Sequence, residues 1–354
     1  MFRGQLIQDK QLIVNFRRHR AMVLLVCHVY PVAFGCVFGF AATAYAENLH
    51  LKLPVACEVG RSCFIQNYVD ADSSPAAKDY MCGTLTYDNH NGTDIRLSSR
   101  EAQRAGVDVV AAAEGRVVRV RDGESDVSVR DNGKETVRGV ECGNGVVIAH
   151  LGGWETQYCH MARGSVQVKA GQPVKAGQPL GRVGLSGMTE YPHLHFTVRR
   201  EGTIVDPFAY RASSGACGEG ESLWEQSLHE QLTYRPRTVL NAGFSSDPVT
   251  MELIESGDVE KTPPAAEAPA IVAFIRAIGL KTGDVQSLSV RDPAGSIIAE
   301  NRAQPLQKDM AQVMLFAGRK RPSGGWGRGV YRAKYIVERN GQVVLGRDLE
   351  LAVR

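Results

Sequence analysis

Two histidines that share one strand face raise the first chemical question in this sequence. The segment YPHLHF (residues 191–196) places His193 and His195 two residues apart, with one apolar residue between them. In a β-strand, alternate side chains point to the same face, roughly 6.5–7 Å apart along the chain. One such histidine could be a hydrogen-bonded core residue. Two on the same face indicate a common centre that both can reach.

A partner segment lies upstream, in YDNHNGTDIRL (87–97), where His90 and Asp94 flank an Asn-Gly turn signal. The turn brings the ends of this segment together, so an imidazole and a carboxylate could approach one metal ion. Two histidines and one carboxylate are a recurring ligand set for catalytic zinc, with the fourth position left to water.

A third segment, TQYCHM (156–161), places His160 at the end of a predicted hairpin strand. The residues alone leave open which of His193 and His195 completes the metal site. The remaining histidine and His160 are then available as base, acid or oxyanion donor, roles that imidazole fills near neutral pH.

The elements around these residues are predicted to be short strands punctuated by glycine, from about residue 80 onward. The segment VKAGQPVKAGQPLG (168–181) contains the sequence VKAGQP twice, and each copy offers a turn followed by an apolar residue. Helical periodicity is scarce in this half of the chain. The expected fold class is therefore all-β.

Together these segments resemble the lysostaphin/LytM-type zinc metalloendopeptidases, which cut peptide cross-links in bacterial cell walls. The resemblance covers residues 79–211 and rests on the early HxxxD, the YxH of YCHM, and the PHLHF element. It implies a glycine-rich antiparallel sheet with an open groove, related to biotinyl/lipoyl carriers. It also implies hydrolysis of peptidoglycan cross-links by attack of zinc-bound water.

The resemblance further implies a role for each histidine and for the aspartate. It makes His90, Asp94 and His195 the ligands of one Zn²⁺ per chain, and His160 and His193 the catalytic pair. Some relatives have lost ligands and serve as non-enzymatic regulators that bind and activate amidases. The complete ligand set favours an enzyme here, and we expect it to be a monomer.

Three features depart from the family pattern. Thr197 follows Phe196 where the family often has Glu, residues 122–141 look like an insertion in a hairpin, and LSGMTEYP (185–192) replaces a Ser/Thr-Gly-rich loop. The last two could alter the substrate groove without touching the metal.

Residues 1–46 are predicted to be a signal peptide, with a basic stretch, a long uncharged apolar run and the small-x-small site AYA. The competing interpretation is a retained membrane anchor, because the apolar run is long enough to span a bilayer. Either way the protein is expected to be exported and to act in the periplasm or outside the cell.

Cysteine usage agrees with export. Six of the eight cysteines follow residue 46, an even number that allows three disulfides in fifteen connectivities. Cys142 and Cys159 flank the arms of a predicted hairpin and are the favoured pair. A cysteine-ligated metal site is the alternative, although no CxxC spacing occurs.

Overall charge gives no support to nucleic-acid binding. The first 46 residues hold five of the 41 basic residues and one of the 38 acidic residues, so the remainder has one more acid than base.

The rest of the chain divides into a lead-in (47–78), a linker (212–240) and a predicted β-sandwich domain (241–354). LWEQSLHEQL in the linker is predicted to be one short helix, and PVTMELIES (248–256) is predicted to be a strand. The sandwich could bind the wall or a partner, or serve as a structural cap. Its basic loop 318–329, which contains Trp326, suits either glycan contact or a solvated hairpin. Whether the lead-in occludes the groove is left open.

Other residues receive weaker assignments. His150 is expected to support a hairpin turn near the site, and His50 and His229 receive no function. Trp154 and Tyr191 could line the groove or pack as ordinary aromatic residues.

Overall fold

The computed structural model describes residues 49–213 and 215–354. The predicted signal peptide, residues 1–46, lies outside them. No helix among the described residues has both the length and the apolar character needed to cross a membrane. The described residues all belong to one compact unit of the chain.

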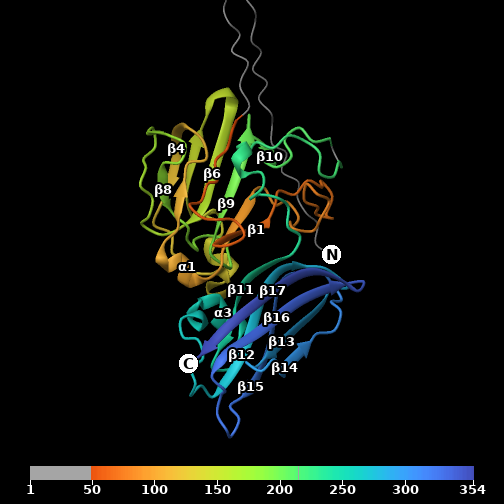
Figure 1. Ribbon diagram of the computed structural model, residues 1–354. Helices are drawn as coiled ribbons and strands as arrows, with labels where there is room; N and C mark the ends of the chain where they lie inside the picture. Colours follow the sequence, from red (N-terminus) through yellow and green to blue (C-terminus); the bar gives the residue numbers. More distant parts are fainter. Residues whose placement is uncertain (1–48, 214) are drawn as a thin grey trace, which may run out of the picture. The chain divides into compact units, whose positions relative to one another are not determined.

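The first half of the described chain forms an antiparallel sheet in the strand order β1-β2-β9-β6-β5-β4-β7, with β10 paired to β9 (Figure 1). A two-stranded sheet of β3 and β8 accompanies it. These strands confirm the all-β prediction, and their bounds are β1 Cys63–Asn67, β2 Thr93–Leu97, β3 Asp108–Val110, β4 Gly115–Arg121, β5 Asn144–Ala149, β6 Trp154–Met161, β7 Pro173–Val174, β8 Pro179–Arg182, β9 His193–Arg200 and β10 Thr203–Val205. One short helix, α1 (Arg100–Ala105), follows β2.

Strand β9 shows how the sequence separates core from site. Its even-numbered residues Leu194, Phe196 and Val198 are buried in the main apolar core. Its odd-numbered residues are polar, and they point to the opposite face of the sheet because strand side chains alternate. The sheet is therefore apolar on one face of this strand and carries histidines on the other.

Two further antiparallel sheets follow, β11-β12-β15 and β14-β13-β16-β17. One apolar core takes residues from both sheets, including Ala273 and Ile275 of β12 and Tyr335 of β16. This arrangement supports the predicted sandwich. The bounds are β11 Thr238–Ser245, β12 Ala270–Leu280, β13 Val285–Arg291, β14 Ile297–Arg302, β15 Met310–Lys320, β16 Gly329–Arg339 and β17 Gln342–Val353.

The strand predicted for PVTMELIES is wrong, because this segment contains helix α3 (Met251–Ser256). The Thr250 hydroxyl accepts a hydrogen bond from the Leu253 amide at 3.1 Å and caps the first turn. Gly257, with φ 83°, ends the helix in the left-handed conformation. A short 3₁₀ turn, η4 (Asp258–Glu260), follows.

The helix predicted for LWEQSLHEQL shrinks to one 3₁₀ turn, η3 (Gln226–Leu228). Trp224 is held in extended conformation by a parallel bridge to Leu51, and its ring is buried in the first core. Tertiary pairing therefore prevents the helix from starting earlier.

The lead-in and the linker are both built into the first sheet's core. Strand β1 pairs with β2 at the sheet edge, and Leu51 and Leu223 are buried in the same apolar cluster. The lead-in thus completes the sheet that carries the histidines.

Three disulfides join all six cysteines of the described residues: Cys57–Cys63, Cys82–Cys217 and Cys142–Cys159. The third confirms the favoured hairpin pair. Cysteines bonded in this way cannot ligate a metal, so the alternative of a cysteine metal site is wrong. Three disulfides are consistent with an extracytoplasmic location.

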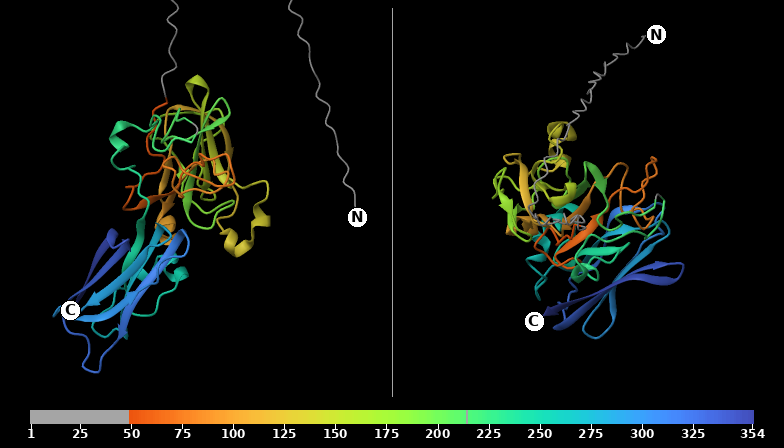
Figure 2. Two further views of the ribbon diagram at one scale, coloured as in Figure 1. Left: turned by 90° about the vertical axis from the view of Figure 1, so that its right-hand side faces the viewer. Right: turned by 90° about the horizontal axis from the view of Figure 1, so that it is seen from above.

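Residues 122–141 do form an insertion between β4 and β5, containing the short helix α2 (Val129–Asn132) and the 3₁₀ turn η1 (Lys134–Val137). This yellow segment projects from the strands in Figure 2. The Arg130 guanidinium ties it to Glu190 at 2.8 Å and to Glu255 of α3 at 3.1 Å.

Candidate metal centre and active site

Three neighbouring strands position four of the five candidate residues. Asp94 on β2 lies directly opposite His195 on β9, and His195 in turn lies opposite Cys159 on β6. His193 and His195 occupy the same face of β9, as the alternation predicts. Asp94 shares this face because residues directly opposite in a sheet point the same way.

His160 reaches this face through a β-bulge. Alternation along β6 would place it with Tyr158, whose side chain is buried in the core. The β5–β6 register shifts between Val146 and Asn144, and His160 adopts φ 62°. An extra residue in a strand re-aims the side chains beyond it. The imidazole of His160 thereby lies 4.7 Å from that of His193, measured between ring centroids.

His90, Asp94 and His195 form a compact donor cluster. The Asp94 Oδ1 atom lies 3.2 Å from His90 Nε2 and 2.8 Å from His195 Nδ1. The two ring nitrogens lie 3.2 Å apart. One ligand atom from each residue fits within 4.8 Å of the others, so the group could hold a metal ion.

Hydrogen bonds at the opposite ring nitrogens orient both histidines of this cluster. His90 Nδ1 lies 2.6 Å from the Tyr68 carbonyl, which can only accept, so Nδ1 carries a proton and, in the neutral ring, Nε2 keeps its lone pair. His195 is reversed: its Nε2 contacts Asn91 Oδ1 at 2.9 Å and Thr197 Oγ1 at 3.1 Å, leaving Nδ1 for the cluster. Such outer partners fix the tautomer of metal-binding histidines.

The other two histidines are oriented in the same way. His160 Nδ1 donates to the Ser186 carbonyl at 2.8 Å, and His193 Nδ1 donates to the Tyr191 carbonyl at 3.0 Å. Each neutral imidazole therefore presents an unprotonated Nε2. That of His193 lies 3.4 Å from Asp94 Oδ1.

Burial and charge shift the pKa values of the cluster in opposite directions. Burial acts to raise the pKa of Asp94, but His90 and His193 outweigh it and hold this pKa well below its usual range. Burial acts to lower the pKa of His90, but Asp94 outweighs it and the pKa is raised. Burial, followed by the neighbouring His193 and His195, lowers the pKa of His160 well below its ordinary value. His160 is therefore neutral at pH 7.

The site opens into a groove whose lining includes Tyr87, Glu141, Met188 and Arg199 besides three of the histidines. Gly92 lets the backbone pass close to His195, because a Cβ there would lie 2.7 Å from His195 Nε2 and from the Phe196 carbonyl. Glycine is thus required at this position for the close approach of the backbone to His195.

Sequence reasoning missed the residues that orient the histidines. Asn91 and Thr197 are polar neighbours of His195. The Tyr68 and Ser186 carbonyls are backbone groups, which carry no signal in residue type. Asn91, inside the segment YDNHNGTDIRL, and Thr197, two residues after His195 on the same strand face, could have been found from the sequence.

The weaker assignments are settled by contacts. His150 bonds the Glu114 carbonyl and Thr156 beside the β5–β6 turn, as expected for a supporting residue. Trp154 is buried in the core and packs against Tyr210. Trp326 is only 9% exposed and donates to the Ala268 carbonyl at 2.8 Å, so its ring is not presented for glycan contact.

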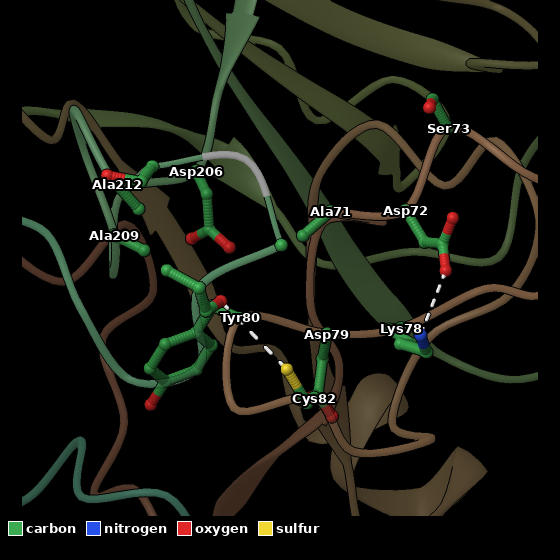
Figure 3. Close-up of a pocket in the computed structure, with 13 residues that line it drawn as sticks. Ala71, Asp72, Ser73, Lys78, Asp79, Tyr80, Cys82, Asp206, Ala209 and Ala212 are labelled. Carbon is green, nitrogen blue, oxygen red and sulfur yellow. Dashed lines mark hydrogen bonds and ion pairs between the residues drawn. The ribbon is translucent and has the colours of Figure 1, made fainter.

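A second pocket lies apart from the five candidate residues (Figure 3). Asp206 and Ala209 line one side, and the Asp72–Lys78 ion pair, 3.3 Å long, lies on the other. Burial raises the pKa of Asp206 to about 7. Among the described residues that line this pocket, no group of three metal-binding side chains is found.

A groove that holds two histidines and an aspartate within reach of one ion, with two more histidines beside them, defines a metallohydrolase type of site. The family model for peptidase family M23 matches residues 88–207, which contain all five residues. The chain therefore contains a domain of peptidase family M23. Its His/Asp/His cluster is the zinc-binding arrangement typical of that family.

Curated relatives and solved structures also match part of this chain. Cell division protein DipM of Caulobacter vibrioides is 44% identical over 64 residues, which are 18% of this chain and 10% of DipM. Peptidoglycan DD-endopeptidase ShyB of Vibrio cholerae is 32% identical over 117 residues, 33% of this chain and 22% of ShyB. The catalytic domain of lysostaphin from Staphylococcus simulans is 24% identical, with a TM-score of 0.26, covering 40% of this chain and 85% of that domain. The matched region is thus less than a quarter of either curated relative.

Proposed function

We propose that this protein is an exported zinc metalloendopeptidase that hydrolyses peptide cross-links of peptidoglycan. The observation that carries the proposal is the convergence of His90, Asp94 and His195 on one point, with His160 and His193 beside it. A non-enzymatic regulator would not need this set, so the complete cluster favours an enzyme.

The donor set fits zinc. Imidazole nitrogen and carboxylate oxygen are its common protein ligands, and three protein ligands leave a position for water or substrate. His90 would bind through Nε2, Asp94 through its carboxylate and His195 through Nδ1. Zinc supplies Lewis-acid polarisation of the scissile carbonyl and a water nucleophile at neutral pH.

His160 and His193 would move the protons. Their Nδ1 atoms are committed to backbone carbonyls, so each neutral ring can only accept a proton at Nε2. One of them accepts the proton of the attacking water, and an imidazolium formed in this way can stabilise the oxyanion or protonate the leaving amine. The low pKa of His160 keeps it in the accepting form.

Among the cross-links open to the family, we favour the direct D-alanyl–diaminopimelate bond over glycine bridges. The support is the name of ShyB, a DD-endopeptidase, which is 32% identical over the matched region. A substrate built of wall peptides also agrees with the predicted export and the three disulfides.

Digestion of defined muropeptides by the zinc-loaded protein tests the proposal. Mass spectrometry should show the D-alanyl–diaminopimelate dimer converted to monomers, with a glycine-bridged dimer left intact and the His195→Ala protein inactive on both. Cleavage of the glycine-bridged dimer alone would mean that the substrate is the glycine bridge and not the D-alanyl–diaminopimelate bond. Failure on both dimers and on whole sacculi would favour the regulator.

A further inference from the structure

A buried cation beside the site has no part in the chemistry above. Arg96 lies on β2, two residues after Asp94 and directly opposite His193 on β9. It is only 1% exposed. We propose that Arg96 is a positioning residue, held from the C-terminal sheets, that fixes Tyr191 and through it His193. This inference rests on the proposed function, because the catalytic role proposed for His193 is what requires its ring to be held in position.

Arg96 reaches His193 through one aromatic ring. The guanidinium carbon lies 3.9 Å from the centroid of the Tyr191 ring, which is a cation–π contact. The Tyr191 ring in turn lies 5.0 Å from the His193 ring. The same residue's carbonyl accepts the His193 Nδ1 proton at 3.0 Å. Tyr191 therefore holds the imidazole both by packing and by its hydrogen bond.

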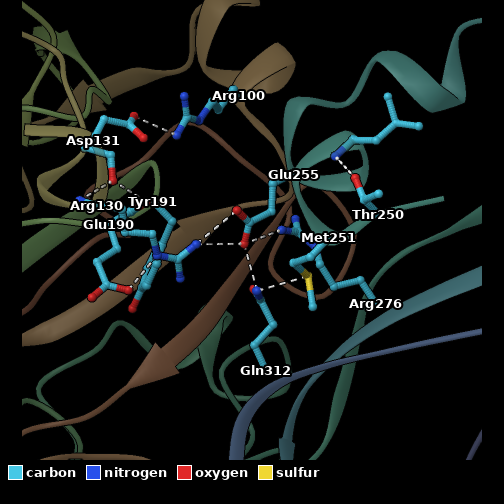
Figure 4. A network of polar contacts seen from close by, with 12 residues as sticks. Arg100, Arg130, Asp131, Glu190, Tyr191, Thr250, Met251, Glu255, Arg276 and Gln312 are labelled. Atoms are coloured by element: carbon cyan, nitrogen blue, oxygen red, sulfur yellow. Dashed lines mark hydrogen bonds and ion pairs between the residues drawn. The ribbon is translucent and has the colours of Figure 1, made fainter.

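The far side of Arg96 is held by the C-terminal half of the chain. Its Nη2 donates to Gln312 Oε1 of β15 at 2.7 Å, and Gln312 Nε2 donates to Glu255 Oε1 of α3 at 2.7 Å. Glu255 also lies 3.8 Å from Arg96 Nη2. Figure 4 shows Glu255 at the centre of this network, with Gln312 and Arg276 directed at its carboxylate.

Stability alone does not account for this cation. Burying a charge costs free energy that imperfect pairing does not recover, and apolar replacements of buried ion pairs are often neutral or stabilising. Arg96 is imperfectly paired, because its Nε atom has no hydrogen-bond partner among the described residues. The planar guanidinium does what an apolar side chain could not: it stacks on Tyr191 while its fork bonds Gln312 and Gln66.

Arg276 of β12 provides a matched control within the same network. It is also 1% exposed, and its Nη1 lies 3.3 Å from Glu255 Oε1. Its other partners are Asn241 Oδ1 at 2.8 Å and the Ser98 carbonyl. Arg276 is as buried as Arg96 and pairs with the same carboxylate, that of Glu255. Among the described residues, however, it makes no stacking contact with Tyr191.

The test compares Arg96→Met with Arg276→Met in the full, zinc-loaded chain. Both should lower the melting temperature and keep the zinc. Arg96→Met should lower kcat on the cross-linked dimer by about 10- to 100-fold with KM little changed, as expected for a misplaced proton-transfer group. Arg276→Met should keep kcat within about twofold of the wild type. Equal kcat values in the two variants would overturn the proposal.

A second readout is independent of activity. In ¹⁵N-histidine spectra of the zinc-free proteins, the His193 ring signals should shift in Arg96→Met and stay in place in Arg276→Met. If this pattern appears but the wild-type protein is inactive, the peptidase function is rejected and the positioning role of Arg96 is kept. If the His193 signals shift in neither variant, the positioning role is rejected. If Arg96→Met does not fold, Tyr191→Leu removes the ring but keeps the carbonyl and must give the same result.

Discussion

The sheet that carries the histidines and the C-terminal sandwich bury polar groups in opposite ways. In the sandwich, fully buried Asp284 is matched by Arg237 at 2.7 Å and Arg339 at 3.1 Å. In the first sheet, two imidazole Nε2 atoms and one Nδ1 atom converge on the single carboxylate of Asp94. Buried polarity alone therefore does not mark a site. The feature that marks the candidate metal site is a set of nitrogen and oxygen lone pairs that face one point and outnumber the hydrogen-bond donors of the protein around them.

The largest expected effect breaks the convergence. Asp94→Ala should abolish zinc binding and lower hydrolysis by about a thousandfold or more, because the ligand set and the Lewis-acid contribution are lost together. Zinc content by mass spectrometry and muropeptide turnover measure both. His90→Ala and His195→Ala should behave alike. A metal-free variant of any of the three with wild-type turnover would refute the ligand assignment.

Removing a proton-transfer group should separate chemistry from metal binding. His160→Ala should retain zinc while kcat falls about 10²- to 10⁴-fold, the range for loss of a general acid or base. Melting temperature and zinc content control for misfolding. Full turnover would move the proton-transfer role away from His160.

A substitution in the C-terminal sandwich should have the opposite effect, lowering stability without lowering activity. Asp284→Ala leaves Arg237 buried without its partner, so the free energy of unfolding should fall by about 3–5 kcal/mol. The zinc content and kcat of the folded protein should not change. Denaturant unfolding and steady-state kinetics on the same sample provide the two values, and a selective loss of kcat would show that this pair serves the site.

The smallest effect concerns the second pocket. The pKa of Asp206 is raised to about 7 in the folded protein, so the native state retains a proton that the unfolded chain has released. Stability from this group is therefore complete below about pH 4 and is lost as the pH rises through 7.

Asp206→Asn should remove that dependence, reducing the fall in unfolding free energy between about pH 4 and pH 8 by roughly 2–4 kcal/mol. Urea unfolding at several pH values measures it. Identical pH profiles for the variant and the wild type would show that Asp206 titrates normally.

Much of the site follows from local sequence rules. Strand alternation correctly places His193 and His195 on one face. The turn predicted at Asn91–Gly92 instead lies at Tyr87–His90, where the His90 amide donates to the Tyr87 carbonyl at 3.0 Å and Asn89 adopts φ 62°. These features depend on neighbours within a few residues, where backbone geometry is fixed by residue type.

The remaining features depend on contacts between distant segments. The bulge that turns His160 toward the groove is set by the register of β5 on β6. The carbonyl that orients His90 belongs to Tyr68. Tyr68 lies in the lead-in, whose sequence does not predict a strand of the sheet. Helix α3 was predicted as a strand because five of the nine residues in PVTMELIES are apolar or β-branched, although Thr250 and Gly257 are good helix caps.

Anomalous diffraction at the zinc edge, from crystals of the metal-loaded protein, examines the coordination hypothesis without relying on any assay. A lone peak should appear bonded to the Nε2 atom of residue 90, the carboxylate of residue 94 and the Nδ1 atom of residue 195. A peak located elsewhere, or contacting fewer than these three side chains, would contradict the assignment.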